Sequence, residues 1–314
     1  MPHLSMRPLT SSIVGVAVAS ALVAGSSSIG GVAGAFQPTT NMVHVSVADR
    51  NGSGVADMQA ADFELKVGGK KRDLVTARPA VVPLRIAILV SDAGTGAFQQ
   101  SIANFMQKLL GRAEFSLVSV IVQPETIVDY TGEAGVLSAA LRRLGTRGTQ
   151  RGAQLMEAIH DVVKGARHEG RRSVILVVRV GAEAPTTVSA DVVREQLRKS
   201  GALLYVVSTV GAQRPAPSQA RPGISTEQAQ LRADEDNDGA IDLAQVLGDG
   251  ASESGGRHDQ IISTTLVPTL ERIAAELLNQ YEITFLREDG KPGDKLSVSS
   301  KRKGVTVRAP ARLR

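Results

Sequence analysis

The sequence predicts an α/β protein whose core is a central, mostly parallel sheet with helices on both faces. Continuous apolar runs, such as 85–90 and 173–178, are typical of strands that are buried on both faces. Segments with apolar residues at helical spacing separate these runs, so strands and helices alternate from about residue 84 onward. This alternation favours one large domain over a set of small β hairpins.

Residues 1–35 have the pattern of a secretory signal peptide. Arg7 is their only formal charge, a weakly apolar run follows from Ser12, and the segment ends in Ala33-Gly34-Ala35. Serines and glycines interrupt the run between 25 and 31, which argues against an uncleaved membrane anchor. We therefore expect cleavage near Ala35 and a secreted or periplasmic mature protein without a transmembrane span. An anchor and a disordered tail are the alternatives.

Residues 36–80 are predicted to form a small β-unit followed by a linker. Apolar residues alternate over 43–47 and again over 63–67, which indicates strands with one buried face. Turn-forming residues follow each segment, at 49–52 and 68–69, so we expect hairpins. Pro79 and Pro83 then mark the linker.

The main domain is predicted over 81–290. Its expected strands are 85–90, 117–122, 127–130, 173–178, 203–207 and 281–286. Its expected helices are 98–109, 136–144, 155–166, 190–199 and 266–278. The strands 117–122 and 127–130 lie too close in sequence for a crossover helix, so we expect them to adjoin. Ser189 is placed to cap the helix that follows it.

Two further segments have a biased composition. Residues 211–260 are first rich in Pro, Gly and Gln and then acidic, which predicts a long insertion that is either functional or disordered. Residues 291–314 contain two β-like pieces, 296–299 and 305–308, and eight basic residues against one acid. This basic end is interpreted as a solvated tail with a lysine-protected strand edge, or as a contact with an anionic surface.

The element order resembles that of a von Willebrand factor A domain. Three segments narrow the resemblance to the bacterial VWFA-related proteins abundant in acidobacteria: 43–65, with Asn51-Gly52 and Ala61-Asp62-Phe63; 246–257, with Ser254-Gly255-Gly256-Arg257; and 277–281. The resemblance implies a Rossmann-like von Willebrand A-type domain with a small N-terminal β-unit and C-terminal β strands. It implies no established reaction.

The resemblance also implies a divalent-cation site at the carboxyl end of the sheet, built from Asp-x-Ser-x-Ser, a Thr and an Asp. Asp92 matches the first ligand, but Gly94 and Gly96 occupy both serine positions. Ala153 stands in place of the Thr and Val180 in place of the last Asp. Mg²⁺ needs several oxygen ligands in near-octahedral geometry. We therefore expect a degenerate site that does not hold Mg²⁺, with Asp92 capping the next helix.

The acidic part of the insertion fits the template of an EF-hand calcium loop over 234–245. Four aspartates occupy ligand positions of this template: Asp234, Asp236, Asp238 and Asp242. Gly239 occupies the turn position, but Gln245 stands where a bidentate glutamate is usual. The segment is interpreted either as a weak Ca²⁺ site suited to extracellular calcium or as a solvated acidic loop tip.

Composition excludes several classes of function. The chain has no Cys, so disulfides, thiolate metal sites, thiol catalysis and a lipid-modified cysteine are excluded. It has 36 Lys and Arg against 31 Asp and Glu, and only three Tyr and six Phe, so nucleic acid is not an expected partner. No Gly-x-Ser-x-Gly elbow or Gly-Lys-Ser/Thr phosphate loop is present.

The sequence therefore predicts an exported, non-enzymatic binding or scaffold module that requires no cofactor. The expected interaction surfaces are the loops around 92–96, 148–152 and 181–187, at the carboxyl ends of the strands. One alternative is an exported enzyme that uses the same cleft. The other is a structural envelope component that binds an anionic surface through its basic C-terminal end. No motif identifies the protein partner or the oligomeric state.

Overall fold

A computed structural model describes residues 40–92, 96–144, 154–168, 170–180, 186, 188–209, 226–286 and 291–314. For 226–229 and 231–236 it describes the backbone alone. The described elements all belong to one unit, Pro38–Arg314. The expected signal peptide lies outside the described residues. Within them, no helix combines the length and the apolar character needed to cross a membrane.

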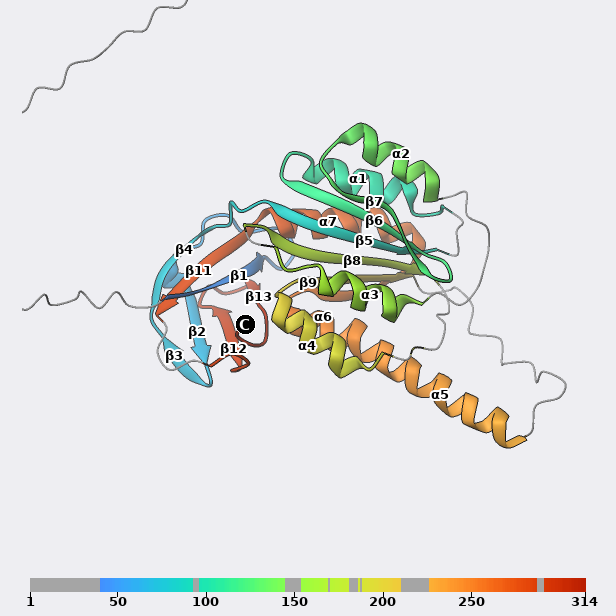
Figure 1. Ribbon diagram of the computed structural model, residues 1–314. Helices are drawn as coiled ribbons and strands as arrows, with labels where there is room; N and C mark the ends of the chain where they lie inside the picture. Colours follow the sequence, from blue (N-terminus) through green and yellow to red (C-terminus); the bar gives the residue numbers. More distant parts are fainter. Residues whose placement is uncertain are drawn as a thin grey trace, which may run out of the picture. The chain divides into compact units, whose positions relative to one another are not determined.

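The central sheet has six strands in the order β10-β9-β8-β5-β6-β7 (Figure 1). Their bounds are β5 (Leu84–Ser91), β6 (Ala113–Val120), β7 (Pro124–Thr131), β8 (Arg172–Val180), β9 (Leu203–Thr209) and β10 (Arg257–Ile261). All neighbours are parallel except β6 and β7, which form the expected adjoining antiparallel pair. This is a doubly wound order that reverses between β5 and β8. The predicted α/β class is confirmed.

Helices cover both faces of this sheet (Figure 1). One face carries α1 (Gln99–Leu109), α2 (Ala134–Leu144) and α7 (Leu266–Leu278). The other carries α3 (Leu155–Lys164), α4 (Ala190–Ser200), α5 (Thr226–Gln245), the π-helical turn Val246–Gly250 and α6 (Ala251–Ser254). The strands supply both cores because successive side chains point to opposite faces. In β5, Ile86 and Ile88 join the first core, and Ala87 and Leu89 join the second.

Strands from both ends of the chain form the β-unit. One sheet has the order β13-β1-β11-β4, and a second has the order β12-β2-β3. The bounds are β1 (Thr40–Ala48), β2 (Phe63–Val67), β3 (Lys70–Arg72), β4 (Leu74–Pro79), β11 (Gln280–Leu286), β12 (Leu296–Ser300) and β13 (Thr306–Arg308). Short 3₁₀ turns lie at Ala60–Asp62 and Ser263–Thr265. The two sheets enclose a third core that includes Phe63, Tyr281 and Phe285.

Two expectations for this part of the chain are wrong, and a third is correct only in part. The strand 281–286 does not complete the central sheet, because β11 pairs with β1 and β4 of the β-unit. Of the expected hairpins, β2–β3 forms as a strand pair, and the turn at 49–52 is closed by the single bridge Ala48–Gly54. The rest of β1 pairs with β11 and β13. The end of the chain is not a solvated tail. Leu296 and Leu313 donate backbone hydrogen bonds to Ala311 and Asp294, and Leu313 is buried.

The segment 211–260, expected as a long insertion that is either functional or disordered, is ordered in its described part. Residues 226–254 are helical, and 257–261 form β10, the sixth strand of the central sheet. The acidic composition of this segment obscured a short apolar stripe in its sequence. Leu243, Val246 and Leu247 form this stripe and are buried against the sheet. Tertiary packing of such a face supplies most of the stability of a helix. Residues 211–225 lie outside the described residues.

Two glycines explain how the helical segment turns into β10. Gly255 ends α6 with φ +92°, a left-handed conformation that residues with a Cβ rarely adopt. At Gly256 an added Cβ would overlap the carbonyl oxygen of Leu204 in β9. The paired glycines of the Ser254-Gly255-Gly256 segment are therefore required by a close approach of the backbone, and not by a ligand.

Candidate functional site

Asp92 lies at the carboxyl end of β5, next to the point where the strand order reverses. Its side chain is buried, and its Oδ2 accepts a 2.7 Å hydrogen bond from the backbone N–H of Gly96. Gly96 has φ +72°, so the bond fixes a tight turn that glycine favours. The expected helix cap is correct only in part, because Asp92 caps the turn before α1 while Phe98 occupies the N-cap position.

The oxygen donors near Asp92 do not fit Mg²⁺. Val180 ends β8 with an aliphatic side chain that packs against the core formed by α1, α2 and α7. The preceding Arg179 brings a cation to the same end of β8. No group of three or more His, Asp or Glu that could hold a metal ion occurs among the described residues. The position of the missing threonine, residue 153, lies outside them.

The expected calcium loop does not have a loop conformation. Residues 234–245 lie within α5, and the backbone is helical from Thr226 to Gln245. An EF-hand loop instead bends around the ion so that alternate residues face it. The prediction of a loop around Asp234, Asp236, Asp238 and Asp242 is therefore wrong in conformation. Calcium binding itself stays a prediction.

The other two loops expected at this edge are mostly outside the described residues. Residues 148–152 are not described, and of 181–187 only Thr186 is. The Thr186 hydroxyl donates a 2.8 Å hydrogen bond to Glu157 in the first turn of α3.

The structure also pairs two residues that no sequence motif marks, Ser208 near the end of β9 and His258 near the start of β10. Ser208 Oγ lies 2.8 Å from His258 Nε2, and both residues are half-buried. Burial and the charge of Arg179 lower the pKa of His258, which favours the neutral form of its ring. The pair joins residues fifty positions apart, and the sequence carries no motif around either of them.

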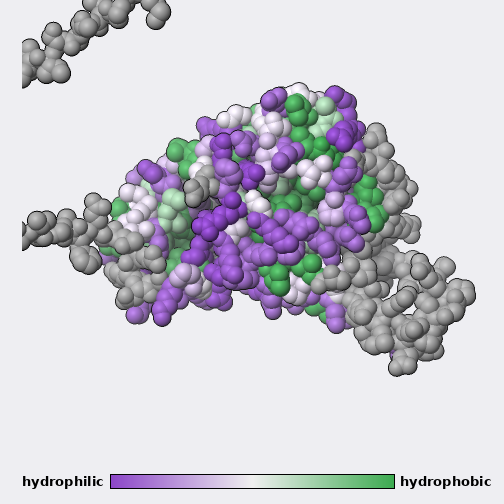
Figure 2. Space-filling view, viewed as in Figure 1, coloured by the Kyte–Doolittle hydropathy of each residue, from purple (hydrophilic) through white to green (hydrophobic). Residues whose placement is uncertain are grey.

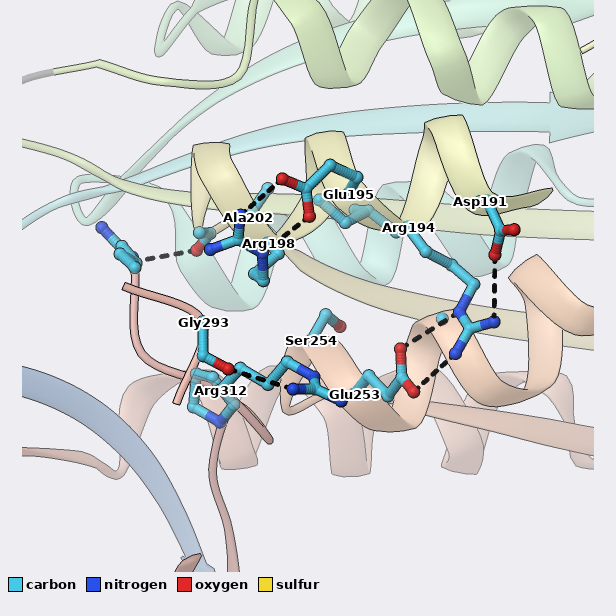
Figure 3. Close-up of a pocket in the computed structure, with 14 residues that line it drawn as sticks. Asp191, Arg194, Glu195, Arg198, Ala202, Glu253, Ser254, Gly293 and Arg312 are labelled. Carbon is cyan, nitrogen blue, oxygen red and sulfur yellow. Dashed lines mark hydrogen bonds and ion pairs between the residues drawn. The ribbon is translucent and has the colours of Figure 1, made fainter. Parts of the chain in front are cut away.

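The opposite, amino-terminal edge of the sheet holds a cavity of about 480 Å³, which we call the arginine pocket (Figure 3). It opens where α4 and α6 meet the C-terminal segment 291–314. Its lining residues are Asp191, Arg194, Glu195, Leu197, Arg198, Gly201, Ala202, Gly250, Glu253, Ser254, Gly293, Pro310, Arg312 and Arg314. Figure 2 shows hydrophilic side chains over much of the visible face between the β-unit and the central sheet.

The carboxylates of the arginine pocket are already paired. Arg194 donates two hydrogen bonds to Glu253, from Nε at 3.1 Å and from Nη2 at 2.6 Å. Arg198 holds Glu195 in the same two-pronged way, with Nε at 2.7 Å from Oε2. This pairing lowers the pKa of Glu195 to about 2. Asp191 lies 3.7 Å from Arg194 at the open end (Figure 3).

The other two arginines of the pocket have no acidic partner among the described residues. Arg312 Nη1 donates to the carbonyl oxygen of Gly293 at 3.0 Å. Arg314 Nη2 donates to the carbonyl oxygen of Gly201 at 3.0 Å. Gly201 has φ +65°, and its missing side chain leaves the space in which the Arg314 guanidinium lies. Two cations therefore face the pocket with only neutral acceptors.

A second cavity, of about 120 Å³, adjoins the arginine pocket through Gly201, Pro310, Arg312 and Arg314. The starts of β8 and β9 and part of β1 complete it. Its lining residues are Asn41, Met42, Val43, His44, Arg171, Arg172, Ser173, Gly201, Leu203, Gln280, Leu296, Pro310, Arg312, Leu313 and Arg314. No Asp or Glu side chain is in this set of described residues.

This arrangement suits the binding of an anion better than proton transfer. Arginine stays protonated, and Glu195, with its pKa lowered to about 2, is a poor base at neutral pH. The Ser254 hydroxyl accepts from Leu204 N–H and donates to the carbonyl oxygen of Ala251. The excess of basic residues over 291–314 was the one sequence signal for this site. This excess did not predict that α4 lies beside the C-terminal segment.

Comparisons with known proteins concern the fold. No family model matches the chain, and no curated protein matches it. BatB from Bacteroides thetaiotaomicron is 12% identical over 62% of this chain and 97% of BatB, with a TM-score of 0.39. A von Willebrand factor type A protein from Catenulispora acidiphila is 9% identical over 88% of this chain and 73% of its own, with a TM-score of 0.42.

The pilus adhesin SpaC from Lactobacillus rhamnosus GG is 8% identical over 79% of this chain and 48% of the adhesin, with a TM-score of 0.43. The chain itself has the expected order of one strand and helix, two adjoining strands and two helices, followed by β8, α4 and β9; α5, α6 and β10 were not expected. From β5 to α7 it forms a doubly wound α/β domain.

Proposed function

We propose that the protein is an exported, non-enzymatic binding or scaffold module whose ligand site is the arginine pocket. The observation that carries this proposal is the lining of the pocket, where two cations face the cavity with no acidic partner among the described residues. A volume of about 480 Å³ lies within the usual range of small-ligand sites. The site also joins α4 to the C-terminal segment, and such junctions are common places for ligands.

Filling the pocket without changing its charge tests this proposal. A Cβ at Gly250 would lie 3.4 Å from Arg194 Cγ and 3.7 Å from Leu197 Cδ1, so Gly250→Met places its side chain at the pocket wall. Gly248 lies in the same π-helical turn and has no atom within 4 Å of an added Cβ. Gly248→Met is therefore a matched control.

The measurement is the recovery of partners from the native exoproteome by full-length wild type and by both variants. We expect Gly248→Met to retain the wild-type partners and Gly250→Met to lose them, with all three proteins folded by circular dichroism. Equal recovery by Gly250→Met would refute the pocket as the binding site. Export is tested by sequencing the N-terminus of the secreted protein, which should begin at Phe36 and not at Met1.

The proposal includes the absence of a working metal-dependent site at the carboxyl edge. Asp92 bonds its own turn, and Val180 supplies no oxygen. We expect neither Mg²⁺ nor Mn²⁺ to raise the melting temperature of the wild type. Micromolar binding of either ion by calorimetry, abolished in Asp92→Ala, would contradict this part of the proposal.

An exported enzyme is the second candidate, and the Ser208–His258 pair favours it. A serine hydroxyl within hydrogen-bond reach of a neutral histidine is the starting arrangement of nucleophilic catalysis. A fluorophosphonate probe tests the pair. Labelling of the wild type that is lost in Ser208→Ala would support the enzyme, and the binding module predicts no labelling.

A further inference from the structure

Arg312 and Arg314 lie two residues apart on the C-terminal segment and line both cavities. The residue between them, Leu313, is buried in the core of the β-unit. This alternation directs both guanidinium groups away from that core and toward α4. Each bonds a single backbone carbonyl oxygen, which leaves further N–H donors on each planar group for a ligand.

A third cation stands at the inner end of the second cavity. Arg172 is 9% exposed, so its charge is almost entirely removed from water. Its Nε donates to the carbonyl oxygen of Val82, and its Nη1 donates to the carbonyl oxygen of Leu277 and to Gln280 Oε1. All three acceptors are neutral. Burying a charge is costly. The nearby buried carboxylate of Glu282 offsets part of that cost, and an anion in the cavity would offset more of it.

His44 lies near the same arginines. Burial has the largest effect on its pKa, which is lowered to about 4. The charges of Arg172 and Arg314 lower this pKa further, and Glu282, 3.8 Å from His44 Nε2, opposes them. The pKa of Arg314 is itself lowered by desolvation and by the nearby Arg167. In the adjoining pocket the three carboxylates face Arg194 and Arg198. None of them lies within ion-pair distance of Arg312 or Arg314.

We propose that the arginine pocket and the second cavity together bind a small multivalent oxyanion, with Arg312 and Arg314 as its main contacts and Arg172 behind them. The planar guanidinium fork matches carboxylate and phosphate groups with two parallel hydrogen bonds. Two such forks on one short segment select ligands that carry more than one such group. This inference rests on the proposed function, because it names the ligand class of the same pocket.

Calorimetric titration of the full chain tests the inference, with citrate as a tricarboxylate probe and sodium triphosphate as a phosphate probe. We expect the wild type to bind at least one of them at low ionic strength and more weakly at 0.5 M NaCl, since salt screens these contacts. Binding of citrate alone assigns carboxylate ligands to the site, and binding of triphosphate alone assigns phosphate ligands.

The variants Arg312→Gln and Arg314→Gln should each weaken binding by about tenfold, and the double variant by about a hundredfold. Among the described residues both side chains bond only backbone carbonyl oxygens, so the variants should fold with unchanged melting temperatures. Arg142→Gln is the matched control, because Arg142 is exposed on α2 and bonds only Ser138. It removes the same charge and should leave the affinity unchanged.

Two results would overturn the inference. One is that neither probe binds the wild type. The other is that the double variant and Arg142→Gln bind equally well, which would assign the affinity to net charge alone. If neither probe binds while Gly250→Met still loses its partners, the pocket remains the binding site and its ligand is not an oxyanion. If Gly250→Met keeps its partners, the proposed function fails as well.

Discussion

The two ends of the central sheet differ in what they offer a ligand. At the carboxyl edge, where open α/β sheets usually bind ligands, Asp92 bonds its own turn and Val180 packs into the core. At the amino edge, α4, α6 and the C-terminal segment enclose the arginine pocket. The difference arises because the C-terminal end of the chain returns beside α4 and adds the guanidiniums of Arg312 and Arg314.

This contrast shows why function has to be argued from a site and not from a fold. A doubly wound sheet usually binds its ligands at the carboxyl edge. The described residues of that edge supply one buried carboxylate and one Ser–His pair. The amino edge, in contrast, has several arginines and carboxylates next to a cavity. Buried contacts of Glu276 stabilise this edge.

The largest expected effect on the free energy of unfolding comes from substituting Glu276, a residue of α7 whose buried contacts stabilise the amino edge. Its side chain is 1% exposed, accepts a hydrogen bond from the Tyr205 hydroxyl at 3.0 Å, and pairs with Arg257 and Arg308. Glu276→Gln leaves two arginines without their buried partner. We expect it to lower the free energy of unfolding by about 3–5 kcal/mol, measured by urea titration.

Glu195→Gln is the comparison for that result. Glu195 pairs with Arg198 on the exposed surface of α4, where ion pairs contribute about 0–1 kcal/mol. Equal losses in Glu276→Gln and Glu195→Gln would show that the buried network does not brace the edge.

The close approach of β9 and β10 should have the next largest effect. Gly256→Ala places a methyl group against the carbonyl oxygen of Leu204, and backbone cannot move aside as a side chain can. We expect a loss of about 3 kcal/mol in the free energy of unfolding. In Gly248→Ala the added methyl group meets open space, so this control should be neutral or slightly stabilising. A neutral Gly256→Ala would contradict the assigned role of the glycine pair.

The smallest expected effect is the contribution of His44 to the loss of folding stability at acid pH. Burial and Arg172 lower its pKa in the folded protein to about 4, below the value of 6.5 expected in the unfolded chain. The unfolded state therefore takes up the proton first as pH falls. This contribution is fully present above about pH 6.5 and is lost as pH falls to about 4, by roughly 2–3 kcal/mol.

His44→Gln should accordingly flatten the decline in unfolding free energy between pH 6.5 and 4, measured by urea titration at several pH values. His258→Gln serves as the control from the carboxyl edge. Burial and Arg179 also lower the pKa of His258, so its effect has the same sign, and we expect it to be smaller. A wild-type decline that His44→Gln leaves unchanged would rule out His44 as its source.

The sequence predicted the central sheet well because its strands carry continuous apolar runs and its helices carry a periodic apolar stripe. It failed where pairing is non-local. Strand β11 looks like any strand after a helix, and only its register with β1 places it in the β-unit. Helix α5 and the π-helical turn after it were missed because this charged segment contains only a short apolar stripe, made of Leu243, Val246 and Leu247.

For the candidate site, the sequence identified Asp92 and the substitutions around it. The sequence also showed an excess of basic residues in the C-terminal segment. It could not place Arg312 and Arg314 beside Gly201, because that contact joins residues more than a hundred positions apart. The pairing of Ser208 with His258 was hidden for the same reason.

The position of the ligand site is the central claim. Hydrogen exchange of the full chain, read by mass spectrometry with and without whichever of citrate or triphosphate binds more tightly, tests it most directly. We expect the ligand to slow exchange in 190–202, 250–256 and 291–314 and to leave 84–92 and 154–164 unchanged. Protection at the carboxyl edge, in 84–92 and 154–164 without change in 291–314, would contradict the claim.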